Sequence, residues 1–207
     1  VARIHLAGDD SPRELVLPVP GEHMALNALA ALIAVRDYGG DVSEALEALT
    51  HFGGVNRRFQ YHGHVGGIRV YDDYAHHPTE ARAVLTAARE VADADAQGLG
   101  HPGRVIVCFQ PHLFSRTEQF AEEFAKALDL ADYAIVLDIY GAREKPIPGV
   151  TSELITTQLT IPHKYQPDFS KVPYDVAAIA EPGDIVLTMG AGNVTMEADA
   201  VIALLKG

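Results

Sequence analysis

Apolar and polar positions along most of the chain follow two repeating patterns, one typical of short buried strands and one typical of one-faced helices. Apolar runs at 104–109, 133–137 and 185–189 predict strands that are buried on both faces. Apolar residues at three- and four-residue spacing predict a helix after each of these runs, and a further helix that begins at Pro78. Strands that alternate with helices predict an α/β fold with a doubly wound, mainly parallel sheet.

The first 56 residues show a different pattern. Two short strand-like runs, 2–6 and 14–19, come before a helix predicted over 22–38, which ends at a pair of glycines. Its apolar residues and alanines cover much of the circumference, so we expect this helix to be well buried. Asp41 and Glu44 have capping-box spacing and predict a second, short helix.

Turn and capping residues mark where the central elements begin. A glycine-marked stretch at 52–56 indicates a boundary between two parts of the chain. The runs 59–64 and 68–71 then predict a hairpin that turns at two glycines. Ser115 and Glu118 have capping-box spacing, so Ser115 is expected to cap the helix that follows.

Composition and charge narrow the classes of protein that fit. The chain has 207 residues and a formal net charge of −12, which argues against a general nucleic-acid or anionic-membrane surface. No apolar run approaches the roughly 20 residues of a membrane-spanning helix. Cys108 is the single cysteine, which fits a reducing cytoplasm. The first residue is Val1 rather than Met, so we expect the chain to be part of a longer protein.

Ligands of doubly wound sheets bind beyond the carboxyl ends of the strands, so the loops there carry the candidate chemistry. The first such loop contains Asp73, His76 and His77, ahead of a helix. A carboxylate there can accept hydrogen bonds from sugar hydroxyls, and the helix N-terminus can face an anion. Alternatively, the acids cap the helix and the histidines lie on the surface. We disfavour a third interpretation, a metal site, because adjacent histidines point in different directions.

Cationic side chains form a second group of candidates. A guanidinium suits phosphate recognition, but for Arg57 and Arg58, at the expected boundary, a surface pair that meets nearby acids is the simpler interpretation. His112 and Arg116 would lie over the crevice, where a substrate carboxylate or phosphate could dock, unless they are merely solvated. His112 could also act as a general base.

Two further loops carry weaker signals. The turn Gly190-Ala191-Gly192-Asn193 is of the phosphate-cradling type, but tight packing of a strand against a helix explains it equally well. The loop 138–149 is either a substrate loop or an ordinary surface connection. No P-loop of the form G-x-x-x-x-G-K-[ST], no G-x-S-x-G and no C-x-x-C occurs in the sequence.

In their identity, order and spacing, these motifs resemble the Mur ligases. Within the family they are most similar to the ligases that join L-alanine to UDP-N-acetylmuramate in peptidoglycan precursor synthesis. Six elements that span nearly the whole chain carry the resemblance: GEHMALNA at 21–28, GVNRRFQ at 54–60, DDYAHHPTE at 72–80, FQPHLFSRT at 109–117, the PIPG-containing loop at 138–149, and GAGNV at 190–194.

The resemblance implies a three-domain enzyme. Residues 1–56 would be the C-terminal part of the central ATP-binding domain, without its P-loop, and residues 57–207 the C-terminal, Rossmann-like domain. The missing N-terminal and central domains would be partners of this chain, with no nucleic acid and no membrane insertion involved. In the implied reaction, ATP phosphorylates the lactyl carboxylate of UDP-N-acetylmuramate, and the amine of L-alanine attacks the acyl phosphate. The Mg²⁺ ligands would lie mostly outside this chain, which would be inactive alone.

The family pattern also implies roles for single residues around ATP. Asn27 and Arg58 would contact ATP, with Arg58 near its terminal phosphates. Asp73 would hold the ribose hydroxyls, and His76 would line the same site. No metal ligand is expected among them.

Two residues would approach the incoming amino acid. His112 and Arg116 would face it, with Arg116 suited to its carboxylate, so Arg58 and His112 are the candidate catalytic residues. The sequence departs from the family at two positions: Met24 replaces the first Asn of a His-Asn-x-x-Asn pattern, and Leu113 stands where many relatives carry Arg.

Three other functions remain open from the sequence. A related ligase that attaches a ready-made tripeptide shares the Asp-Asp-x-Ala-His-His-Pro pattern, although the run 110–112 and the Pro-Ile-Pro-Gly loop favour the alanine enzyme. The chain could also be a stand-alone nucleotide-binding module, or a metallohydrolase built on the acids and histidines of 72–77.

Overall fold

The computed structural model describes residues 1–94 and 103–206, and the chain divides into two compact units, Val1–Val55 and Asn56–Gly207. The sequence had placed the boundary between residues 56 and 57. The helices and strands of the first unit are β1 (Ala2–Ile4), β2 (Arg13–Leu15), α1 (Glu22–Asp37) and α2 (Val42–Thr50).

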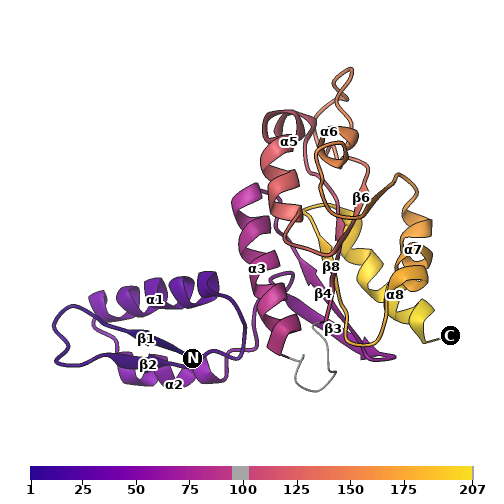
Figure 1. The fold of residues 1–207 in the computed structure, drawn as a ribbon. Coiled ribbons are helices and arrows are strands. Elements are labelled where there is room, and N and C mark those ends of the chain that lie inside the picture. Colours follow the sequence, from indigo (N-terminus) through magenta and orange to yellow (C-terminus); the bar gives the residue numbers. More distant parts are fainter. Residues whose placement is uncertain (95–102, 207) are drawn as a thin grey trace. The chain divides into compact units, whose positions relative to one another are not determined.

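In the first unit, the antiparallel pair β1–β2 packs with α1 and α2 (Figure 1). The Asp41 carboxylate accepts hydrogen bonds from the backbone N–H groups of Ser43 and Glu44, so the predicted cap of α2 is confirmed. The expectation that α1 is well buried is wrong, because Leu26 is 59% exposed. Three residues of α1 are buried, and the alanines on its other sides are tolerated in solvent because alanine favours helix without needing burial.

The second unit is built on a six-stranded sheet with the strand order β3-β4-β8-β5-β6-β7. The first pair, β3–β4, is antiparallel and all other pairs are parallel, which confirms the predicted fold class. The strands are β3 (Gln60–Val65), β4 (Ile68–Asp73), β5 (Val105–Phe109), β6 (Tyr133–Leu137), β7 (His163–Gln166) and β8 (Ile185–Met189).

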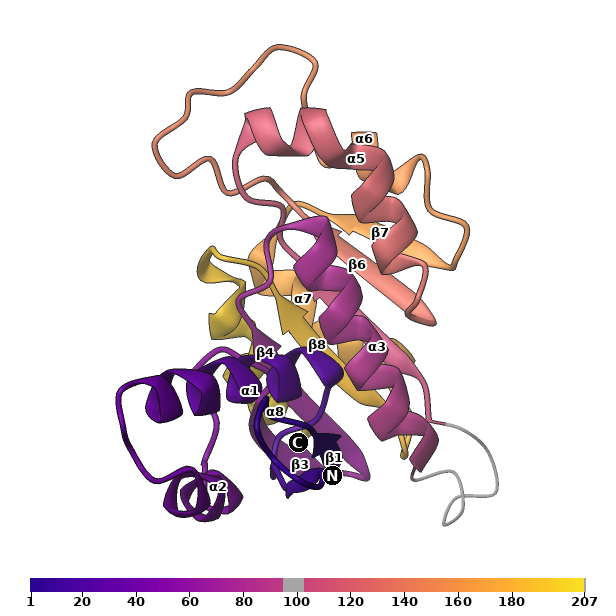
Figure 2. The ribbon, with the colours of Figure 1, turned by 90° about the vertical axis from the view of Figure 1, so that its left-hand side faces the viewer.

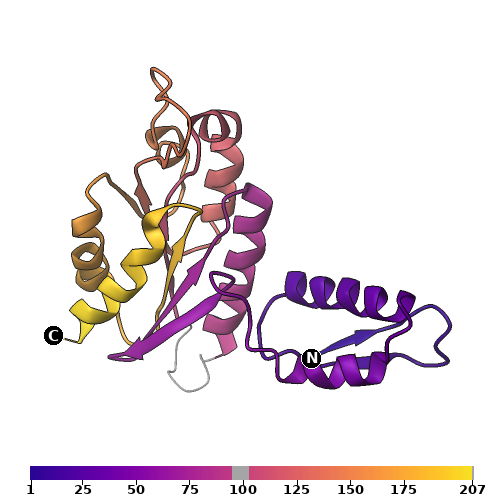
Figure 3. The ribbon, with the colours of Figure 1, turned by 180° about the vertical axis from the view of Figure 1, so that it is seen from behind.

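Helices cover both faces of this sheet. In Figures 1 and 2, α3 and α5 lie on one face, whereas Figure 3 shows α8 and α7 on the other. The alternation of side chains along β5 explains the two layers: Val107 and Phe109 pack toward α3 and α5, and Ile106 and Cys108 pack toward α7 and α8. The helices are α3 (Pro78–Ala94), α5 (Phe114–Leu128), α6 (Glu153–Thr156), α7 (Val172–Ile179) and α8 (Met196–Leu205).

Turn and capping residues in the sequence predict most of the observed turns and helix ends, with two exceptions. The hairpin turns where predicted, at Gly66 and Gly67, whose φ angles of 58° and 83° suit glycine. Ser115, however, does not cap α5, because it lies inside the first turn, and its backbone N–H and hydroxyl donate to Glu144. The helix predicted after the run 133–137 is also short, since only the four residues Glu153–Thr156 are α-helical.

No helix in the described ranges is long and apolar enough to cross a membrane.

Candidate functional site

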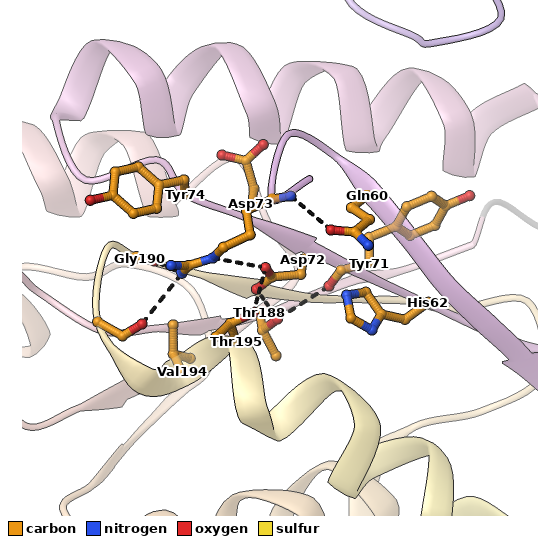
Figure 4. A network of polar contacts seen from close by, with 12 residues as sticks. Gln60, His62, Tyr71, Asp72, Asp73, Tyr74, Thr188, Gly190, Val194 and Thr195 are labelled. Carbon is orange, nitrogen blue, oxygen red and sulfur yellow. Dashed lines mark hydrogen bonds and ion pairs between the residues drawn. The ribbon is translucent and has the colours of Figure 1, made fainter. Parts of the chain in front are cut away.

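Asp72 lies at the centre of a buried polar network at the carboxyl end of β4. Figure 4 shows its side chain beside Thr188 and Thr195, whose hydroxyls donate to it at 2.7 and 2.8 Å. The guanidinium of Arg57 donates to the same carboxylate, with an Nε–Oδ2 distance of 3.2 Å. A fully buried carboxylate needs such partners, so this network ties the end of β4 to β8 and to the turn before α8.

Arg57 makes several contacts within the second unit. Its Nη2 donates to the carbonyl of Gly190 at 2.5 Å and to that of Gly192 at 3.4 Å, and its guanidinium lies 4.7 Å from the centre of the Tyr74 ring. Its backbone N–H donates to the side chain of Gln60, and its φ of 59° is unusual for a residue with a side chain. Arg57 therefore matches the simpler interpretation of the arginine pair, an arginine that meets an acid.

Arg58 differs from its neighbour. It is half-buried and lies with its guanidinium 5.8 Å from the centre of the Tyr74 ring. Within residues 1–94 and 103–206, no hydrogen bond or ion pair occupies the Arg58 guanidinium. Its five N–H donors thus fit the demands of a phosphate group.

Asp73, the second acid of the pair, is 1% exposed and holds two backbone segments together. One carboxylate oxygen accepts the N–H of Ala75 and the other accepts the N–H of Phe59, both at 2.7 Å. Burial raises the pKa of Asp73 to about 6, while the two N–H groups and the nearby Arg58 oppose this increase. Each oxygen keeps a further lone pair, which is the capacity that a contact to a sugar hydroxyl would use.

The N-terminus of α3 is capped by its own acid. Glu80 accepts hydrogen bonds from the backbone N–H groups of His76 and His77, at 3.0 and 3.2 Å. The two histidine rings point to different neighbours: His76 lies 5.7 Å from the ring of His112, and His77 lies 5.1 Å from the ring of Phe120. The expectation that adjacent histidines diverge is confirmed, and Glu80 fills the position in which an anion would face this helix.

His76, His112 and Arg116 come together beyond the ends of β4 and β5. Arg116 donates to the carbonyl oxygen of His76 at 3.3 Å and contacts Nδ1 of His112 at 3.4 Å. A guanidinium can only donate, so Nδ1 of His112 is the acceptor and the proton of its neutral ring is on Nε2. Burial, followed by the positive charge of Arg116 and the proximity of His76, lowers the pKa of His112. His112 is thus held in the form that can accept a proton.

Two residues of the loop 138–149 join this group, and neither was singled out from the sequence. Tyr140 stacks on His112, with ring centres 5.8 Å apart and planes inclined by 19°. Glu144 accepts the backbone N–H of Ser115 at 3.0 Å and also its hydroxyl. The available signal was the position of the loop after a strand, at the edge where ligands bind.

The glycine turn at 190–192 has a clear packing role. A Cβ atom on Gly192 would lie 2.2 Å from Oε1 of Gln110, and one on Gly190 would lie 2.6 Å from the carbonyl oxygen of Gln110. Gln110 is buried and accepts the N–H of Val194, which holds the turn against the end of β5. Tight packing therefore accounts for these glycines.

The first unit carries the last two positions discussed from the sequence. Asn27 is exposed on α1, and Met24 is buried against the same unit. In the part of the chain that the structure describes, no three His, Cys, Asp or Glu side chains come together as a metal site would require.

Comparison of the sequence with models of protein families identifies the family, which the geometry of the site alone does not. Residues 57–192 match the model of the Mur ligase, glutamate ligase domain. The chain belongs to the Mur ligase family. The match spans every strand of the second unit, and includes Arg58, Asp73, His76, His112 and Arg116.

Individual relatives agree with this assignment. The chain is 55% identical to the UDP-N-acetylmuramate–L-alanine ligase of Rhodococcus opacus, over 100% of its own length and 42% of the relative. Among solved structures, it resembles the UDP-N-acetylmuramate–alanine ligase of Thermotoga maritima, with 31% identity, a TM-score of 0.74, and 92% of this chain and 39% of the other covered. A murein peptide ligase of Psychrobacter arcticus shares the fold, with 23% identity, a TM-score of 0.67, and coverage of 97% and 40%. This chain thus spans less than half of each of these relatives.

Proposed function

We propose that the chain is the C-terminal part of an ATP-dependent ligase that joins L-alanine to UDP-N-acetylmuramate through an acyl phosphate, in the cytoplasm. The observation that supports this most directly is the pairing of Arg116 with a neutral His112 in a chain that is 55% identical to such a ligase. An α-amino acid carries its carboxylate and its amine on one carbon, so it needs a cation and a proton acceptor side by side. Nη1 of Arg116 and Nδ1 of His112, 3.4 Å apart, supply these two groups.

The proposed roles follow from the chemistry of each side chain. Arg116 binds the carboxylate of alanine, which replaces Nδ1 of His112 as the acceptor of the Arg116 N–H. The freed Nδ1 then takes a proton from the alanine amine, because only the uncharged amine can attack the acyl phosphate. Arg58 binds the terminal phosphates of ATP, where a fixed cation stabilises the charge that develops during phosphoryl transfer.

Nucleotide contacts complete the proposal. Asp73 and His76 line the nucleotide site, and Asn27 is proposed as a further contact of ATP. The P-loop and most Mg²⁺ ligands belong to domains outside this chain, and Mg²⁺ would neutralise phosphate charge there. We therefore expect the 207-residue chain alone to be inactive.

A chimera tests the proposal. This chain replaces the matching 42% of the Rhodococcus opacus ligase, and phosphate release from ATP is measured with and without each of the other two substrates. We expect release that depends on both UDP-N-acetylmuramate and L-alanine, and none from this chain alone. ATP hydrolysis that ignores L-alanine would overturn the proposal and favour a nucleotide-binding module.

Variants of the same chimera separate the roles. Arg116→Ala should raise the KM for L-alanine, whereas Arg58→Ala should lower kcat about 10²–10³-fold, the loss expected when a group that stabilises transition-state charge is removed. Equal effects of the two variants on all parameters would contradict the assigned roles.

A further inference from the structure

The loops that follow β5 and β6 are joined beyond the ends of their strands. The N–H of Leu113 donates to the carbonyl oxygen of Tyr140 at 2.9 Å, and the N–H of Tyr140 donates to that of Pro111 at 2.8 Å. These two bonds form a parallel bridge between His112 and Tyr140. The pairing of β5 with β6 is thus extended to the residue on which the proposed proton transfer depends.

The ring of Tyr140 is partly exposed and has two close neighbours. One neighbour is the imidazole of His112, on which it stacks at 5.8 Å, and the other is the glycine turn, since a Cβ on Gly192 would lie 2.9 Å from the ring. The Tyr140 side chain therefore cannot leave His112 by moving toward the glycine turn. His76 and Arg116 also lie beside His112.

Glu144 anchors the tyrosine-bearing loop, 138–149, at a second point. Its carboxylate accepts two hydrogen bonds from Ser115 in the first turn of α5, one helical turn after His112 along the chain. Leu113 and Ala142 adopt φ angles of 73° and 51°, which residues with side chains rarely occupy. Such conformations persist only where surrounding contacts impose them, and they concentrate at functional sites.

We propose that Tyr140 is a positioning residue: its ring and backbone hold the imidazole of His112 with Nδ1 toward Arg116, and Glu144 keeps the tyrosine-bearing loop in place. This inference rests on the proposed function, in which His112 accepts the proton of the amine. The tyrosine hydroxyl plays no part in it, so phenylalanine should replace tyrosine without loss.

Histidine NMR on the 207-residue chain tests the inference without any activity. The ¹⁵N shifts of His112 report which ring nitrogen carries the proton, and a titration gives its pKa. The charged and titratable groups that face His112 are Arg116, His76, Glu144 and Tyr140. In the native chain and in Tyr140→Phe, we expect the Nε2–H form and a pKa below the ordinary value of about 6.5.

Removing the Tyr140 ring should allow the His112 imidazole to change its orientation. In Tyr140→Ala the two backbone bonds can still form, so the change isolates the ring. We expect the pKa of His112 to rise toward about 6.5 and the two tautomers to become mixed, because burial and the stack are lost. Glu144→Gln should move the pKa in the opposite direction, since a negative charge near His112 is removed. Unchanged signals of His77, which packs against Phe120, show that the variants are folded.

The chimera supplies the second readout. Tyr140→Phe should keep kcat, whereas Tyr140→Ala should lower kcat about tenfold. In Tyr140→Ala the acidic limb of the pH profile of kcat should move to higher pH, because the pKa of His112 rises, and the KM for ATP should stay unchanged. If the NMR signals of His112 are the same in Tyr140→Ala as in the native chain, the inference is overturned even if the chimera makes amide. If His112 responds as expected and every chimera is inactive, the proposed function fails and the positioning role stands.

Discussion

Two adjacent arginines illustrate how the fold assigns different tasks to identical side chains. Arg57 neutralises the buried Asp72 and donates to the glycine turn, whereas the guanidinium of Arg58 lies beside the Tyr74 ring and makes no hydrogen bond or ion pair in the described ranges. Sequence patterns do not distinguish the two arginines, because two partners of the Arg57 guanidinium, the carbonyls of Gly190 and Gly192, lie more than a hundred residues away in the chain. The Arg58 guanidinium, and not that of Arg57, therefore keeps N–H donors that the proposed phosphate contact would use.

The difference between the arginines predicts a difference in stability. Arg57→Ala leaves a buried carboxylate without its cation, and should lower the free energy of unfolding by about 2–4 kcal/mol. Arg58→Ala should change it by no more than about 0.5 kcal/mol. Urea denaturation of both variants measures this, and equal losses would contradict the assignment.

Asp73 provides a prediction about pH. Its pKa of about 6 in the folded protein lies above the ordinary value of 3.8, so the folded state binds more protons than the unfolded state between these two values. Its contribution to the free energy of unfolding should therefore decrease as pH rises from about 4 to about 6, by at most about 3 kcal/mol, and stay constant above.

A comparison of the native chain with Asp73→Asn isolates this contribution, since asparagine does not titrate. The native chain should gain stability relative to the variant as pH falls from 6 to 4. A ¹³C titration of Asp73 with a midpoint near 4 would show that the expected shift is absent.

At the scale of elements, local patterns predicted most of what is seen. The fully buried run 105–109, the helix that begins at Pro78, and the hairpin at Gly66 and Gly67 all follow from sequence-local periodicity and turn chemistry. Contacts between loops were not predictable in this way. The start of α5 is an example. Ser115 was predicted to cap this helix, but its backbone N–H donates to Glu144, which lies 29 residues further along the chain in another loop.

The glycine turn offers a test of packing between elements. Gly192→Ala should lower the free energy of unfolding by about 1–3 kcal/mol, because its Cβ would overlap the side chain of Gln110. The double variant with Gln110→Ala should cost less than the sum of the two single variants, since the overlapping atoms are removed. Urea unfolding gives the coupling, and strict additivity would contradict the packing explanation.

At the scale of the whole molecule, the chain consists of two units of unequal size. Val1–Val55 is at the lower limit of what a hydrophobic core can stabilise, whereas Asn56–Gly207 contains a six-stranded sheet covered on both faces. The family match at 57–192 lies within the larger unit, and the glycines at 53 and 54 come just before it. The larger unit should fold without the smaller one.

Limited proteolysis tests this independence. We expect cleavage near residues 53–56 and a stable product that begins close to Asn56, identified by mass spectrometry. A recombinant 56–207 fragment should unfold cooperatively in urea. Simultaneous degradation of the whole chain, without such a product, would contradict the expectation.

The most direct test of the proposed ligase function is the identity of the product. The chimera receives ATP, UDP-N-acetylmuramate and equal amounts of L-alanine and a ready-made tripeptide, and the amide is identified by mass spectrometry, with the unmodified Rhodococcus opacus ligase as control. The arrangement of Arg116 and His112, together with the 55% identity, predicts the L-alanyl product. A tripeptide product, or no amide from a folded chimera under conditions in which the control is active, would contradict the proposed function.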